Sequence, residues 1–145
     1  MARDDLHTLI RLRKFEVDER QRAMAALLRR EEAVLSGLDA LDQEKAAEAA
    51  FMTKAEIWEG ATFTAYLEHW EIRRQQFMQA LDEVRHQIER ARDELSDAYR
   101  RLKTFEVTKE QRDEAEALEE SRAEQGELDE MGIELHRRGQ RAELL

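Results

Sequence analysis

The clearest candidate for chemistry in this sequence is a Glu-x-x-His pair formed by Glu83 and His86. Residues three positions apart share a helix face, so this carboxylate and imidazole could hold one metal ion. Di-iron carboxylate proteins use this spacing, but they need two such pairs and further inward-facing carboxylates in a four-helix bundle. The sequence has no second pair, and His7, His69 and His136 stand at no ligand spacing with one another. We therefore expect no metal site and interpret His86 as a surface residue.

Motifs for catalysis and cofactor binding are also missing from the sequence. It contains no phosphate-binding Gly-x-x-x-x-Gly-Lys loop, no Gly-x-Ser-x-Gly elbow and no Gly-x-Gly-x-x-Gly turn. It has no cysteine, which rules out disulfides and thiolate ligands. We expect a protein that is not an enzyme and that binds no cofactor.

A group of aromatic residues near the middle of the chain could stack on nucleic acid bases. The group consists of Trp58, Phe63, Tyr66 and Trp70. Nucleic acid binding draws its affinity from clustered basic residues, whereas this chain has a formal net charge of −10. We expect these aromatic residues to pack the tip of a helical hairpin, and we expect no nucleic acid partner.

The composition indicates long, solvated helices as the elements that carry these residues. Of the 145 residues, 40% are Asp, Glu, Lys or Arg and none is proline, so nothing obliges a helix to break. No apolar run approaches the roughly 18 residues of a membrane-spanning helix, and the N-terminus lacks the apolar stretch of a signal peptide. These features predict a cytoplasmic, all-α protein.

Apolar residues recur at alternating steps of four and three, which is typical of the seam of a left-handed coiled coil. In the second half the seam contains Phe77, Leu81, Val84, Ile88, Ala91, Leu95, Ala98, Leu102 and Phe105. A weaker seam in the first half contains Ile10, Val17, Met24, Leu27, Val34, Leu38 and Leu41. Two seams predict two helices that pack against each other.

The apolar pattern lapses around Gly60, which predicts the turn between the helices. Gly60 can supply a left-handed backbone, and Thr62 or Thr64 can cap the next helix. The sequence therefore predicts helix one at about 4–57, a turn at about 58–62 and helix two at about 63–138. A short turn between long helices favours an antiparallel arrangement, so residues 1–145 are interpreted as a single coiled-coil hairpin.

The longer second helix should extend beyond its partner. Beyond about residue 118 helix one offers no pairing residue, which predicts a C-terminal overhang of about 40 Å at 1.5 Å per residue. Acidic residues predominate from Glu106 to Glu134, either as a solvated helix face or as a negative arm that enters a basic cavity. Leu118, Leu128, Met131 and Leu135 persist there out of phase with the earlier seam, which favours docking to a partner.

Two stretches of the sequence resemble those of the flagellar export proteins called the FliJ family. Trp70-Glu-Ile-Arg-Arg-Gln-Gln-Phe77-Met-Gln-Ala-Leu81 resembles the start of that family's second helix. Arg122-Ala-Glu-Gln125-Gly-Glu-Leu128-Asp129-Glu130 is similar to its late Arg-x-x-Gln-x-x-(Leu/Met)-Asp-Glu run. The resemblance covers essentially the whole chain. The virulence secretion family YscO shares the same architecture.

The resemblance implies a stalk in a type III export apparatus, similar to the coiled-coil γ subunit of rotary ATPases. The implied partners are the hexameric export ATPase (FliI), whose assembly and turnover the stalk favours, and the export gate protein (FlhA). The implied location is peripheral, at the cytoplasmic face of the membrane-embedded export machinery. Carried over to this sequence, the gate-binding residues are Phe77, Leu81, Val84 and Leu41, and the ATPase-binding residues are Arg122, Gln125, Leu128, Asp129 and Glu130.

Three other functions are compatible with the sequence. A virulence-type secretion stalk would use the same architecture. An export chaperone would hold export substrates or escort other chaperones. A structural spacer would pair its overhangs with copies of itself to form dimers or filaments.

Overall fold

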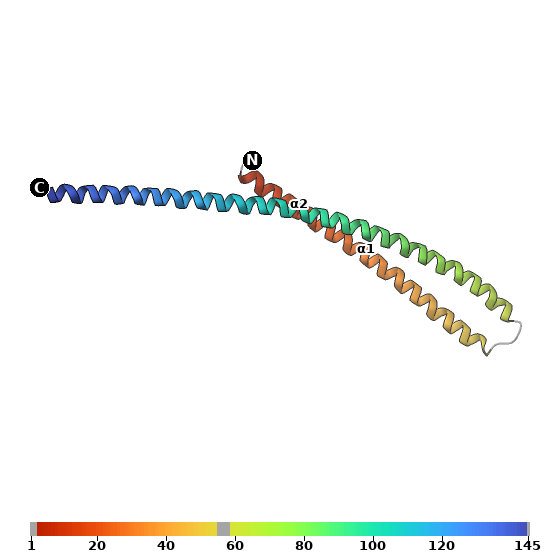
Figure 1. Cartoon of the computed structure of the whole chain (residues 1–145). Coiled ribbons are helices and arrows are strands. Elements are labelled where there is room, and N and C mark those ends of the chain that lie inside the picture. The colour runs from red at the N-terminus through yellow and green to blue at the C-terminus, as the bar shows by residue number, and fades with distance from the viewer. Residues whose placement is uncertain (1–2, 55–58, 145) are drawn as a thin grey trace. The chain divides into compact units, whose positions relative to one another are not determined.

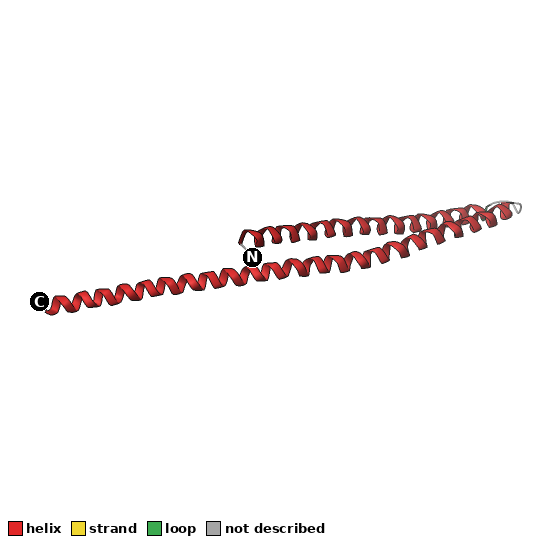
Figure 2. Ribbon diagram, turned by 90° about the horizontal axis from the view of Figure 1, so that it is seen from above, coloured by secondary structure: helices red, strands yellow, loops and turns green. Residues whose placement is uncertain are grey.

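The computed structural model describes residues 3–54 and 59–144 of the chain. The described residues form two helices, α1 (Arg3–Met52) and α2 (Glu59–Leu144), and contain no strand (Figures 1 and 2). This confirms the predicted all-α class built on two long helices that pack against each other. The interpretation of residues 1–145 as a single hairpin stays a prediction.

Both helix boundaries near the turn differ from the sequence-based ones. α1 ends at Met52, five residues before the predicted end, and residues 55–58 lie outside the described part of the chain. Three hydrogen bonds close the end of α1. The Thr53 amide donates to the Ala49 carbonyl at 3.2 Å, the Lys54 amide donates to the Phe51 carbonyl at 3.1 Å, and the Thr53 hydroxyl donates to the Ala50 carbonyl at 2.7 Å. They satisfy carbonyls that a helix end otherwise leaves unpaired.

The predicted role of Gly60 as a left-handed turn residue is wrong. Gly60 lies inside α2, and no described glycine has a positive φ. Thr64 caps nothing, because its hydroxyl donates to the Gly60 carbonyl at 3.1 Å, one helical turn back. Extending an existing helix gains one hydrogen bond per residue, which offsets the roughly 1 kcal/mol that glycine costs within it. The same reasoning explains why α2 continues to Leu144 rather than ending near residue 138.

Contacts divide the chain into two units: residues 12–100 form the first, and residues 1–11 with 101–145 form the second. In the first unit α1 and α2 run antiparallel. Three ion pairs show this direction, because the residue numbers rise on one helix as they fall on the other (Figure 1). They are Arg20–Glu94 at 2.7 Å, Glu31–Arg85 at 3.3 Å and Glu44–Arg73 at 3.3 Å.

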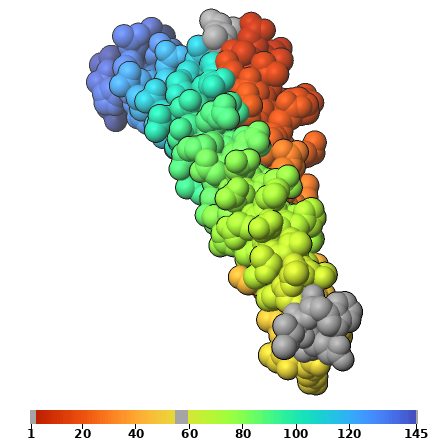
Figure 3. Space-filling model, turned by 90° about the vertical axis from the view of Figure 1, so that its right-hand side faces the viewer, coloured from red at the N-terminus to blue at the C-terminus, as the bar shows by residue number. Residues whose placement is uncertain are grey.

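The core of the first unit is the predicted seam. Leu81, Val84 and Ile88 form a buried cluster on α2. Four half-buried residues of α1 pack against it: Met24, Leu27, Val34 and Leu38. Ala91 and Ala98 are also buried, and their small side chains let the helices approach closely. Figure 3 shows the packed helices in space-filling form.

The second unit combines the start of α1 with the end of α2. Leu6 and Ile10 are buried in it, and Arg3 forms an ion pair with Glu116 at 3.7 Å. From Glu114 to Leu144 every residue of α2 is exposed. We call residues 118–144 the C-terminal arm. Its exposure agrees with the predicted overhang.

Candidate partner-binding surfaces

Most of the predicted gate-binding residues lie in the interhelical core. Leu41, Leu81 and Val84 expose 2%, 5% and 3% of their surface, whereas Phe77 is half-buried. Buried aliphatic side chains of this kind stabilise a coiled coil by leaving water. In this conformation Phe77 is the member of the set that offers surface to a partner.

The ring of Phe77 rests directly on the backbone of α1 at Gly37. A Cβ atom at position 37 would lie 2.5 Å from Phe77 Cε1, closer than two carbon atoms can approach. Gly37 therefore determines where the Phe77 ring sits. Sequence reasoning missed this residue, because periodicity along one helix does not show which residue of the other helix it faces.

A polar network surrounds Leu41 and ties the two helices together. The indole Nε1 of Trp70 donates a hydrogen bond to the Leu41 carbonyl at 2.8 Å, and Lys45 Nζ lies 4.2 Å from the Trp70 ring centroid. Arg73 contacts Glu44 on the opposite helix. Buried Trp N–H groups need such a partner, so this bond fixes the pairing of α1 with α2 locally.

The aromatic residues near the turn pack within the protein, as predicted, wherever the structure describes them. Trp70 is buried, and Phe63 and Tyr66 stack with ring centroids 6.0 Å apart. Burial raises the pKa of the Tyr66 hydroxyl above its ordinary value, and the negative charge of Glu44 raises it further. Trp58 lies outside the described residues.

His86 lies on the surface of α2, as the sequence predicted. Its Nε2 is 3.7 Å from Asp82 and its Nδ1 is 3.9 Å from Glu89, both on the same helix. Within residues 3–54 and 59–144, no group of three or more His, Asp or Glu residues could hold a metal ion.

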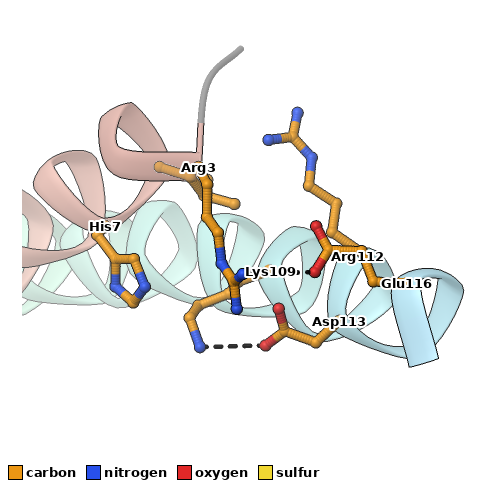
Figure 4. A pocket seen from close by; sticks show the side chains of 7 residues that line it. Arg3, His7, Lys109, Arg112, Asp113 and Glu116 are labelled. Carbon is orange, nitrogen blue, oxygen red and sulfur yellow. Dashed lines mark hydrogen bonds and ion pairs between the residues drawn. The ribbon is translucent and has the colours of Figure 1, made fainter. Parts of the chain in front are cut away.

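A shallow pocket of about 170 Å³ lies in the second unit, between the start of α1 and α2 (Figure 4). Its lining is Arg3, Leu6, His7, Lys109, Arg112, Asp113 and Glu116. Lys109 pairs with Asp113 at 3.2 Å, and Arg3 pairs with Glu116. The Arg3–Glu116 pair joins the start of α1 to α2, whereas the Lys109–Asp113 pair lies within α2. The lining includes no Ser, Thr or Cys that could act as a nucleophile.

The predicted ATPase-binding residues all lie on the C-terminal arm, and all are exposed. With about 100° of rotation per residue, Arg122, Gln125 and Asp129 share one face of the helix. On this face Gln125 Nε2 donates to Asp129 Oδ1 at 3.1 Å. The signature therefore presents a polar, hydrogen-bonded strip to solvent.

Leu128 belongs to a second face of the arm. Leu128, Met131 and Leu135 recur at steps of three and four, so they form one apolar stripe, which we call the arm stripe. They are 61%, 61% and 63% exposed. Glu130 lies about 160° around the helix from Leu128. The five signature residues consequently face several directions around α2.

Comparison with known proteins gives one result that spans the chain. The family model described as Flagellar FliJ protein matches residues 1–141. No curated protein and no solved structure matches the chain. Neither helix contains, in its described part, an apolar run long enough to cross a membrane. Because the match covers 141 of the 145 residues, the chain belongs to the flagellar FliJ family, whose members are components of flagellar type III export.

Proposed function

We propose that this export component is a stalk that binds the ring of the export ATPase through its C-terminal arm. The observation that carries the proposal is the arm stripe. Leu128, Met131 and Leu135 remain more than half exposed, although each would gain free energy by leaving water. A contiguous apolar stripe that no residue of 3–54 or 59–144 covers is suited to docking on another protein.

The physical state of the arm supports this proposal. Tertiary packing of an amphipathic face provides most helical stability in proteins. The arm has no such packing along residues 118–144. A surrounding partner would supply it.

The distribution of the signature residues fits a partner that encloses the helix. Arg122, Leu128 and Glu130 point in three different directions around α2. A flat partner would contact only one of these directions, whereas the interior of a ring can contact them all. The acidic residues that predominate on the arm suit a cavity with a basic lining.

A contact with the export gate is the second part of the proposal. We assign it to Phe77, which is half-buried, and to its neighbour Met78, which is 41% exposed. Leu41, Leu81 and Val84 support this patch from the core, where they hold the two helices together. The stalk would thereby connect the ATPase ring with the gate.

Turnover of the cognate export ATPase tests the arm assignment. We expect wild-type protein to stimulate ATP hydrolysis and the double variant Leu128→Ala/Glu130→Ala to lose at least ~80% of that stimulation, with helix content unchanged. Each exposed anchor removed from a binding interface costs about 1–2 kcal/mol, so two such losses weaken binding at least 10-fold.

The matched control is Leu35→Ala/Glu32→Ala on α1, where Leu35 is 41% exposed and Glu32 is exposed. It removes the same residue types from a surface outside the arm and should stimulate normally. Equal stimulation by the arm variant and wild type would contradict the assignment. A pull-down that retained export substrates but not the ATPase would favour the chaperone alternative.

A further inference from the structure

The arm stripe continues, at the same steps of three and four, into two charged residues of opposite sign. Glu124 precedes Leu128 by four positions, and Arg138 follows Leu135 by three. Both lie on the face of the stripe, seven positions before and seven positions after Met131. The stripe is therefore an apolar centre flanked by an acid on one side and a base on the other.

We propose that the C-terminal arms of two copies of this chain pair in antiparallel orientation, centred near Met131. In an antiparallel pair, positions at equal distance from the centre meet, so Glu124 of each copy lies beside Arg138 of the other. In a parallel pair Glu124 would meet Glu124 and Arg138 would meet Arg138. A charged residue on the seam of a coiled coil selects orientation in this way.

The charges beside the stripe neither favour nor oppose this orientation. Glu120 of one copy would approach Arg141 of the other, and Glu127 would approach Glu134, each contact occurring twice in the pair. When the contacts between Glu124 and Arg138 are counted as well, the attractive contacts outnumber the repulsive ones. Exposed charges of this kind interact weakly, so the apolar stripe provides the attraction and the charges select the direction.

Two features of the free arm make pairing accessible. Arg138 now contacts Glu134 of its own helix at 3.4 Å, with 71% and 56% of the two side chains exposed, so little is lost when Arg138 exchanges partners. Gly132 and Gly139 carry no side chain and lie beside the stripe, which lets a second helix come close. The stripe is short, so we expect a reversible dimer with a dissociation constant on the order of 10–100 μM.

This inference goes beyond the proposed function and does not depend on it. If both hold, the second copy and the ATPase compete for Leu128, and the dimer is the state of protein that has not yet bound the ring. The test below contains no ATPase, so its outcome is independent of the stimulation assay.

Sedimentation equilibrium of the full chain over a wide concentration range tests the pairing. We expect the wild type to dimerise, and we expect Glu124→Arg or Arg138→Glu alone to raise the dissociation constant at least 10-fold. The charge-swapped chain, Glu124→Arg/Arg138→Glu, should return to within about threefold of wild type, because the attractive pairs are rebuilt in reverse. The control Glu119→Arg/Arg137→Glu changes the same charges on the solvent side of the arm and should dimerise normally, as should each of its single variants.

Cysteine cross-linking tests the orientation, since the chain contains no cysteine of its own. A mixture of Glu124→Cys and Arg138→Cys chains should form a mixed disulfide on oxidation, whereas neither variant alone should link to itself. Self-linking of each variant without the mixed product would show parallel pairing and overturn the proposal. A wild type that stays monomeric at all concentrations, or a charge swap that fails to restore association, would also overturn it.

Discussion

Phe77 occupies the position at which packing and partner binding are hardest to separate. It belongs to the seam, is half-buried, and forms the proposed gate contact together with the exposed Met78. Truncation of Phe77 lowers the stability of the protein whether the side chain only packs or also binds a partner. Only a binding role predicts that gate binding weakens by more than the loss of stability explains.

We expect Phe77→Ala to lower the free energy of unfolding by about 2 kcal/mol, roughly half of the cost for a fully buried phenylalanine, and to weaken gate binding at least 10-fold. Leu95→Ala is the matched control, because Leu95 is also a half-buried seam residue of α2. Urea unfolding and a binding titration with the gate protein measure the two effects. Equal loss of binding in both variants would make Phe77 a packing residue alone.

Gly37 gives a second prediction at this scale. Gly37→Ala should gain up to about 1 kcal/mol of helix propensity but lose about 1–3 kcal/mol because the new methyl group overlaps the Phe77 ring. We therefore expect net destabilisation of about 1 kcal/mol in urea unfolding. Adding Phe77→Leu should recover part of the loss by making room. Stabilisation by Gly37→Ala alone would show that the ring moves aside freely.

At the scale of single residues, the sequence predicted the seam but not its fine packing. The spacing of Leu81, Val84 and Ile88 was sufficient, because burial follows helical periodicity. The contact between Gly37 and Phe77 depends on which residues face each other across two helices, and periodicity along one helix does not specify that register. The hydrogen bond from Trp70 to the Leu41 carbonyl was missed for the same reason.

The presence of the two helices was easy to predict from the sequence. The residues at which they begin and end were harder to predict. Long seams without proline leave little alternative to α1 and α2. The turn was misplaced because Gly60 was taken as a break, whereas helix extension tolerates a glycine.

The other glycines of α2 follow the same rule. A methyl group at Gly126 would meet nothing within 4 Å. Gly126→Ala should therefore raise helix content and stabilise the arm by about 0.5–1 kcal/mol. Far-UV circular dichroism during thermal unfolding measures this, as an increased helical signal that persists to higher temperature. A decreased signal would indicate that Gly126 contacts another part of the protein.

At the scale of the whole molecule, the family match places the chain in flagellar type III export. The C-terminal arm could be predicted by counting the residues on each side of the turn, because the helix that follows the turn is much longer than the one before it. The arm stripe was visible as apolar residues out of phase with the seam. The charge symmetry about Met131 is present in the sequence, and the structure adds that this face is exposed.

We propose that the C-terminal arm acts on the export ATPase while residues 3–117 maintain the paired helices. Measuring ATPase turnover with full-length protein and with protein that ends at Ala117 tests it most directly. We expect the full-length protein to stimulate turnover and the shortened protein to have no effect, although its paired helices unfold at nearly the same temperature. Stimulation by the shortened protein equal to that of the full chain would contradict the claim.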